Sequence, residues 1–366
     1  MLRTPLCDKL GIKYPVLQAG MGIFKGVVTP PELVAAVSNA GGMGCIGGSG
    51  LEPEELRQAI RRIRSLTDKP FGVDLLIPSK MSATTGTRED IRKEIDRMYP
   101  EHRKLVDGLF ERYGVPRSKV EKEFTITEEM TSEQARVVFE EKVPVFVVGL
   151  GDPGKFRGIA NETGTLIAGI AGSLNNAKRQ IQAQVDFLIV QGAEAGGHTG
   201  TIGTFPLVPQ VVDAVSPVPV VAAGGIADGR GLVASLALGA QAVWCGTAFL
   251  FADEVNLHPA HREQIDRGRS EDFVVSRVFT GKPSRTFHND VHTIWAQSGL
   301  QPLPMPHQKI LMEDFLDSAR RNGRLDVCGN PCGQIAGMMQ GARPAAKIVA
   351  DMVSQAEKII GGWSGR

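Results

Sequence analysis

The sequence predicts an α/β fold, a (β/α)8 TIM barrel, from three observations. Eight short apolar runs alternate with segments of helical pattern over residues 1–250. The runs are continuously apolar, which indicates strands buried on both faces of a parallel sheet. Glycines follow several runs directly, as in Gly224-Gly225. A doubly wound open sheet is the competing fold, but the closure of the cycle at eight strands favours the barrel.

The expected strands follow one another along the chain with helices between them. The strands are Val16–Gln18, Gly42–Gly47, Phe71–Ile77, Val143–Leu150, Thr165–Ile170, Asp186–Gln191, Val218–Ala223 and Ala242–Gly246. The helices are expected over Pro30–Asn39, Glu52–Arg64, Gly154–Glu162, Ser173–Gln184, Pro206–Val215 and Asp228–Leu238. Thr29, Ser173 and Asp228 are predicted helix caps, because their short side chains can accept hydrogen bonds from free backbone N–H groups.

Two segments do not fit the strand and helix cycle. Residues 79–141 follow the third strand and contain charged helical pieces at Arg88–Arg97 and Glu101–Tyr113. This insertion is either a surface excursion or a lid over the mouth of the barrel. Residues 251–335 predict a mainly helical substrate subdomain after strand eight. The amphipathic stretch Pro344–Ile360 predicts a C-terminal helix within residues 336–366 that packs back on the barrel.

Composition excludes several classes of protein. Hydrophobic residues make up 42% and charged residues 22% of the chain, as in globular proteins. The net charge of +1 does not indicate binding to nucleic acid or to an anionic membrane. No apolar run is long enough to cross a bilayer, and the start of the chain lacks a signal-peptide pattern. The five cysteines predict no disulfide framework, and Cys328 and Cys332 predict no metal site. We expect a cytoplasmic protein.

The residues after strands seven and eight predict a phosphate site. Gly224-Gly225 follows one strand, and Cys245-Gly246-Thr247 follows the other. These two loops often bind phosphate in barrels, because glycine exposes backbone N–H groups and a helix N-terminus adds positive partial charge. The alternative is that the paired glycines only form tight turns.

His198 is the candidate catalytic residue. It lies in the glycine-rich run Gln191–Gly200 (QGAEAGGHTG), directly after strand six. An unperturbed imidazole titrates near neutral pH, which suits proton transfer, although a single histidine is often structural. Neither His288 with His292 nor His258 with His261 has the partners of a metal site.

Several longer runs resemble the nitronate monooxygenase family, formerly called 2-nitropropane dioxygenase, to which the FMN-dependent enoyl-acyl-carrier-protein reductases are related. The matching runs are Tyr14–Met21 (YPVLQAGM), Ala40–Gly48 (AGGMGCIGG), Phe71–Leu76 (FGVDLL), Gln191–Gly200, Phe205–Ala214 (FPLVPQVVDA), Val218–Gly231 (VPVVAAGGIADGRG), Gly239–Leu250 (GAQAVWCGTAFL), Gly281–Asn289 (GKPSRTFHN) and Gly333–Gly337 (GQIAG). The resemblance covers most of the chain outside residues 79–141.

The resemblance implies FMN bound without a covalent link at the barrel mouth, with His198 as the base. The cofactor-binding residues it implies are Gln18, Met21, Asp74, Gln191, Gly196, Gly197, Gly224, Gly225, Trp244, Cys245, Gly246 and Thr247. The chain departs from the family pattern at Gly20, Asp74 and Ala248, where proline, asparagine and arginine are common. A carboxylate at residue 74 would disfavour an anionic reduced flavin unless the carboxylate were protonated or paired.

The resemblance implies an FMN-dependent oxidoreductase that oxidises alkyl nitronates with O2 to a carbonyl compound and nitrite. The alternative is an NAD(P)H-dependent FMN reductase acting on a quinone or an unsaturated acyl thioester. A third hypothesis, a non-enzymatic binder of a phosphate ligand, does not explain a histidine in the glycine-rich loop. The expected partners are a small-molecule substrate with O2 or NAD(P)H, no nucleic acid and no membrane, and a homodimer is compatible with the sequence.

Overall fold

The computed structural model describes residues 2–23, 26–77, 87–118, 120 and 128–364. Eight parallel strands form the central sheet, in the order β1-β11-β10-β8-β7-β6-β5-β4. They are β1 (Val16–Gln18), β4 (Gly44–Gly47), β5 (Phe71–Leu76), β6 (Val145–Gly149), β7 (Leu166–Ala171), β8 (Phe187–Gln191), β10 (Val220–Ala223) and β11 (Ala242–Cys245). Each of these strands overlaps one of the eight expected from the sequence.

The sheet closes into a barrel between its first and last strands. Leu17 of β1 pairs with Met43 in a parallel bridge just before β4. The Gln18 N–H donates to the Met43 carbonyl oxygen at 2.9 Å, and the Met43 N–H donates to the Val16 carbonyl oxygen at 3.0 Å. This closure confirms the TIM barrel and excludes the open doubly wound sheet, which would leave two strand edges unpaired.

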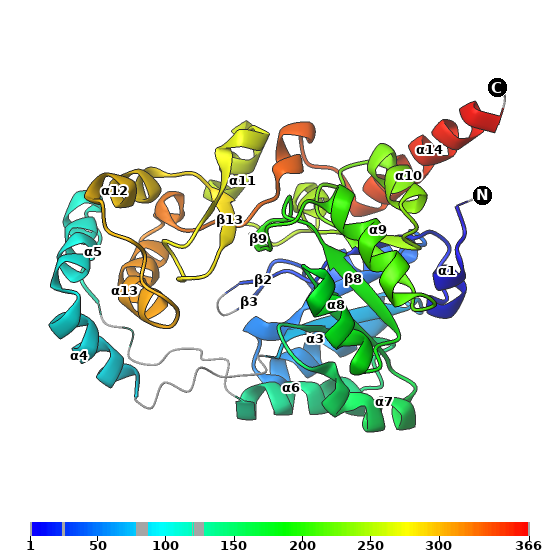
Figure 1. Ribbon diagram of the computed structural model, residues 1–366, viewed down its shortest axis with the longest axis horizontal. Helices are drawn as coiled ribbons and strands as arrows, with labels where there is room; N and C mark the ends of the chain where they lie inside the picture. The colour runs from blue at the N-terminus through cyan, green and yellow to red at the C-terminus, as the bar shows by residue number, and fades with distance from the viewer. Residues whose placement is uncertain (1, 24–25, 78–86, 119, 121–127, 365–366) are drawn as a thin grey trace.

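Helices surround the barrel (Figure 1). They are α2 (Pro31–Asn39), α3 (Pro53–Leu66), α6 (Glu128–Glu140), α7 (Arg157–Thr163), α8 (Leu174–Gln182), α9 (Thr204–Val215), α10 (Gly229–Ala237) and α14 (Ala345–Ser364). The Ser173 and Asp228 side chains accept from the backbone N–H groups of Asn176 and Arg230, as predicted for caps. The prediction for Thr29 is wrong, because Pro30 is the N-cap of α2 and provides no side-chain bond. The Thr29 hydroxyl instead accepts from the N–H groups of Met21 (3.2 Å) and Gly47 (3.0 Å).

The C-terminal helix α14 completes the helical layer. It packs against α10 and α2. At Gly229 a β-carbon would lie 2.5 Å from the Ala356 nitrogen and 2.6 Å from the Met352 carbonyl oxygen, so the absence of a side chain allows this close contact. The chain therefore leaves the barrel after β11 and returns with α14 to cover it.

The residues between β11 and α14 form more than helices. They include α11 (Pro259–Arg267), α12 (Asp290–Ser298) and α13 (His307–Arg321), as expected of a mainly helical segment. They also include β12 (Phe273–Ser276) and β13 (Ser284–Phe287), which form an antiparallel sheet with β9 (Gly197–His198). This sheet was not predicted from the sequence, because its strands are only two to four residues long and carry polar side chains.

The insertion after β5 contributes three helices within the described residues: α4 (Arg88–Met98), α5 (Pro100–Tyr113) and α6. The first two cover the predicted helical pieces and gather beside α12 and α13, away from the barrel (Figure 1). The third helix, α6, packs on α3 and β5 as part of the barrel and was not predicted. The expected division into residues 1–250, 251–335 and 336–366 stays a prediction. No helix in the described part of the chain is long and apolar enough to cross a membrane.

Candidate active site

A large cavity lies at the carboxyl ends of the barrel strands, where the active sites of this fold occur. Its volume is about 1540 Å³, and several residues between 250 and 335 contribute to its wall along with the loops of the barrel. The structure brings most of the predicted site residues together there: Met21, Asp74, Gln191, Gly196, Gly197, His198, Gly224, Gly225, Trp244, Cys245, Gly246 and Thr247. None of the described residues that line the cavity comes from α4 or α5.

Gln18 is the predicted cofactor-binding residue that does not line the cavity. Its side chain is fully buried between β1 and β4. The amide oxygen accepts from the Cys45 N–H at 3.0 Å, and the amide nitrogen donates to the Cys45 carbonyl oxygen at 3.0 Å. The Gln18 amide is therefore occupied in holding β1 against β4.

The expected phosphate loops provide free backbone donors. Gly224 and Gly225 have φ angles of +92° and +75°, which favour glycine. Within the described residues, the backbone N–H groups of Gly225, Gly246 and Thr247 donate to no protein acceptor. The N-terminus of α10 contributes less than expected, because the Asp228 carboxylate already accepts from the Arg230 N–H at 2.9 Å. The residues present fit a phosphate that is held by these backbone donors. The negative charge of Asp228 would keep the phosphate away from the N-terminus of α10.

The Thr247 hydroxyl also braces the cavity wall. Its oxygen accepts from the Gly333 N–H at 2.8 Å. A β-carbon at Gly196 would lie 2.6 Å from the Cys332 carbonyl carbon, so the loop after β8 contacts residues 332–333 closely. The loops after β8 and β11 thus meet through the returning chain, although residues 247 and 333 are far apart in sequence.

His198 lies on the short strand β9 rather than in a free loop. It pairs with Ser284 of β13, and its backbone carbonyl accepts from the Gln191 side-chain amide at 2.9 Å. The Nδ1 atom lies 3.1 Å from the Pro283 carbonyl oxygen. Because a carbonyl can only accept, Nδ1 carries the proton, and the neutral ring has its lone pair on Nε2.

The surroundings of His198 favour the neutral imidazole. The ring opens on the cavity, but the protein around it partly removes water and lowers its pKa, and the nearby Lys282 cation acts in the same direction. The Pro283 carbonyl opposes this shift without reversing it. At neutral pH, His198 therefore has the protonation state of a base.

Arg285 is a functional candidate that was not predicted from the sequence. It is buried on β13 opposite Gly197 and donates to the Ala193 carbonyl oxygen at 2.8 Å and the Phe273 carbonyl oxygen at 2.5 Å. The guanidinium thus connects the loop that carries His198 to the sheet β12-β13-β9. Arg285 belongs to the run GKPSRTFHN, but the pattern alone does not indicate that its side chain reaches residue 193.

The cysteines form no reactive group at the site. Cys45 and Cys245 are buried, and burial raises the pKa of the Cys245 thiol to about 12. Cys328 and Cys332 are also buried and unpaired. Among the described residues, no group of three or more histidine, cysteine or acidic side chains could hold a metal ion.

Known proteins place the chain in one family. The family described as nitronate monooxygenase matches residues 3–355. A protein of Staphylococcus saprophyticus named probable nitronate monooxygenase is 38% identical, and the match covers 98% of this chain and 99% of that protein. The solved structure of nitroalkane oxidase from Streptomyces ansochromogenes is 26% identical, with a TM-score of 0.82 over 98% of this chain and 99% of that one.

The solved structure of FabK from Thermotoga maritima is 31% identical, with a TM-score of 0.76. This match covers 100% of this chain and 99% of the FabK chain. The matches extend over the barrel and over the residues that follow β11. The chain therefore belongs to the nitronate monooxygenase family of oxidoreductase enzymes.

Proposed function

We propose that the protein is an FMN-dependent oxidoreductase that oxidises alkyl nitronates with O2, giving a carbonyl compound and nitrite. One observation carries this proposal: His198, with an unprotonated Nε2, lines the same cavity as three residues with free backbone N–H groups. These three residues are Gly225, Gly246 and Thr247. FMN bound at these donors would supply the electron transfer between substrate and oxygen. Membership of the nitronate monooxygenase family supports the reaction class.

His198 would act on the neutral nitroalkane. Its Nε2 would take the proton from the carbon that bears the nitro group, which forms the nitronate within the site. The Pro283 carbonyl would accept a hydrogen bond from Nδ1–H throughout and would orient the resulting imidazolium. Gln191 and Arg285 would keep the strand that carries His198 in place by their bonds to the His198 and Ala193 carbonyl oxygens. A substrate supplied as the nitronate has already lost this proton.

The variant His198→Asn tests this role. We expect kcat/KM for a neutral nitroalkane to fall by about 10²–10⁴-fold, the usual contribution of a general base, while kcat/KM for the matching nitronate changes far less. Wild-type turnover of the nitroalkane should decline as pH falls through the lowered pKa of His198. FMN content should be unchanged.

A matched control is His258→Asn. His258 also lines the cavity, but its side chain accepts from the Ala260 N–H at the start of α11, a role that asparagine can fill. We expect kcat/KM to stay unchanged in this variant for both the nitroalkane and the nitronate. Equal losses for nitroalkane and nitronate in His198→Asn would exclude His198 as the base.

A second function is favoured by the likeness to FabK. In this alternative, NAD(P)H would reduce the bound FMN, and a quinone or an unsaturated acyl thioester would be reduced in turn. The cavity of about 1540 Å³ has room for a substrate larger than a small nitronate. Anaerobic mixing with NADH or NADPH separates the two functions, because rapid bleaching of the flavin would support the reductase. A cytoplasmic location and a homodimer stay predictions.

A further inference from the structure

Asp74 lies on the inner face of the barrel. Along β5, Phe71, Val73 and Leu75 are buried in the cluster beneath α3 and α6. Because successive side chains of a strand point to opposite faces, residues 72, 74 and 76 point into the barrel. Asp74 and Leu76 accordingly line the cavity, and Asp74 is in register with Gly47 of β4 and Val147 of β6.

The described backbone around Asp74 leaves space for its carboxyl group but donates no hydrogen bond to it. A β-carbon at Gly20 would lie 2.6 Å from the Asp74 Cβ and 3.2 Å from its Oδ2 atom. Glycine at residue 20 therefore lets the loop after β1 pass directly over the carboxyl group. Gly149 is also close, since a β-carbon there would lie 3.9 Å from Oδ1.

Three carboxyl groups line the cavity among the described residues, and they differ in their donors. Glu194 accepts from the Thr204 N–H and hydroxyl at 2.8–3.0 Å, and Asp152 accepts from the Gly154 N–H at 2.8 Å. No described residue donates a hydrogen bond to Asp74 or forms an ion pair with it. Of these three carboxyl groups, Asp74 is the one left to find its partner in a ligand.

The groups packed against Asp74 do not favour its charged form. Among the described residues, the neighbouring titratable side chain is Cys45 on β4, a thiol whose own pKa is raised by burial and by Asp74. The other neighbours are Gly47, Val147, Gly149 and the Gly20 backbone, none of which titrates. Burial raises the pKa of Asp74 to about 7.

We propose that Asp74 meets the flavin as a neutral carboxylic acid that donates a hydrogen bond to an acceptor atom of FMN, so that loss of its proton weakens FMN binding. An ionised carboxylate can only accept, and it would face the same acceptor with a negative charge. The inference rests on the FMN site of the proposed function and is independent of nitronate chemistry.

The consequence is an FMN affinity that depends on pH. If the protonated form binds, the apparent Kd is constant well below pH 7 and rises about tenfold for each pH unit above it, until the ionised form binds by itself. The sign follows from the raised pKa, since the favourable proton is present at low pH and is lost as pH rises. Asparagine at residue 74 keeps an N–H donor at every pH.

The test measures FMN released on dilution of the holoenzyme, by flavin fluorescence, between pH 6 and pH 8.5. We expect wild-type Kd to rise at least tenfold over this range. The Kd of Asp74→Asn should change little and should stay near the wild-type value at pH 6. The control Asp152→Asn should follow the wild-type profile, because that carboxylate already has a backbone donor.

A wild-type Kd that is flat with pH would overturn the proposal, as would an equal rise in Asp74→Asn. Thermal melting of both apoproteins at each pH separates a folding defect from weakened binding. If FMN binds with the expected profile but no nitronate is oxidised, the inference stands while the proposed reaction fails. If FMN does not bind at any pH, both fail.

Discussion

The inserted residues 79–141 supply helices to two different parts of the molecule. Helix α6 lies on the barrel, where Val137, Val138 and Phe139 join the buried cluster around β5 and β6. Helices α4 and α5 join a separate cluster with α12 and α13, in which Phe110 packs against Phe315 with ring centroids 5.5 Å apart. Continuity in sequence therefore does not decide which core a helix belongs to, because each helix packs where its apolar face can be buried.

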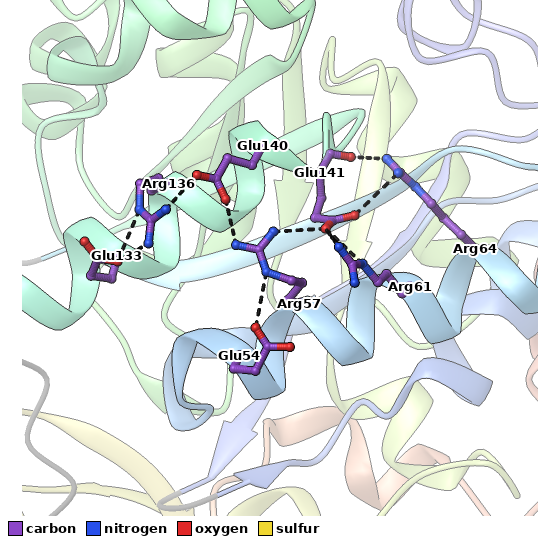
Figure 2. A network of polar contacts seen from close by, with 8 residues as sticks. All are labelled: Glu54, Arg57, Arg61, Arg64, Glu133, Arg136, Glu140 and Glu141. Atoms are coloured by element: carbon purple, nitrogen blue, oxygen red, sulfur yellow. Dashed lines mark hydrogen bonds and ion pairs between the residues drawn. The ribbon is translucent and has the colours of Figure 1, made fainter.

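The two parts also differ in how their charges are used. Around α6, a network of arginines and glutamates links the end of α6 to α3 (Figure 2). In this network the Glu141 side chain is 10% exposed, but its partner Arg61 is 63% exposed. Between α4 and α13, Glu313 is 7% exposed and pairs with Arg88 and Arg92, which are 25% and 12% exposed, so both sides of this ion pair are enclosed. Exposed ion pairs contribute little to stability, whereas removing one partner of an enclosed pair has a larger effect.

The positions of α4 and α5 distinguish the two interpretations of the insertion. No described residue of α4 or α5 lines the cavity, so these helices do not cover the site as a lid would. They pack against α12 and α13 in one buried cluster, and α13 contributes Arg320 to the cavity wall. An effect of this region on the substrate would therefore be indirect.

The largest expected effect comes from the aromatic side chains of the two clusters. Phe110→Ala and Phe139→Ala should each lower the free energy of unfolding of their own cluster by about 3–5 kcal/mol. Phe139→Ala should promote FMN release on urea titration, because Phe139 packs beneath β5 and β6. Phe110→Ala should retain FMN and alter the KM of the organic substrate. Equal FMN loss in both variants would show that the two parts unfold together.

A smaller loss is expected at the enclosed ion pair. Glu313→Gln leaves two guanidinium groups facing an amide, and we expect about 2–3 kcal/mol of destabilisation in urea unfolding, reduced from the fully buried case because Arg88 is 25% exposed. The matched control is Glu111→Gln, whose side chain is 79% exposed beside Arg117. A loss at Glu313 no greater than at Glu111 would contradict the assignment of this pair to a buried interface.

The smallest expected effect is at Glu141 and depends on pH. Burial opposes ionisation of this carboxyl group, but Arg61 and Arg57 outweigh it and lower its pKa. A lowered pKa stabilises the fold above the ordinary value of about 4.5, and that contribution disappears as pH falls through the lowered pKa. Glu141→Gln should therefore cost about 1 kcal/mol at pH 7 and nothing at strongly acid pH, measured by urea unfolding. Glu133→Gln, at an exposed pair, should have less effect at pH 7.

Local sequence was sufficient to predict the barrel. Most of the strands are short apolar runs followed closely by glycine, and this pattern is set by neighbouring residues alone. The cap at Thr29 was mispredicted because a hydroxyl near a helix start has competing partners, and here the N–H groups of Met21 and Gly47 use it. Helix α6 was missed because its apolar face is short and lies within a charged insertion.

The sequence by itself determined the barrel, the loops that line the cavity and the candidate histidine, because these follow from residue types at fixed positions along each strand. Tertiary structure decided the rest. The pairing of β9 with β13, the Pro283 carbonyl that sets the proton on His198, and the bond from Arg285 to Ala193 all join residues about 85 to 92 positions apart. Packing likewise turned Gln18 toward Cys45 and left Asp74 without a hydrogen-bond donor among the described residues. No local pattern encodes such contacts, because they depend on which distant backbone comes within hydrogen-bond distance once the barrel has closed.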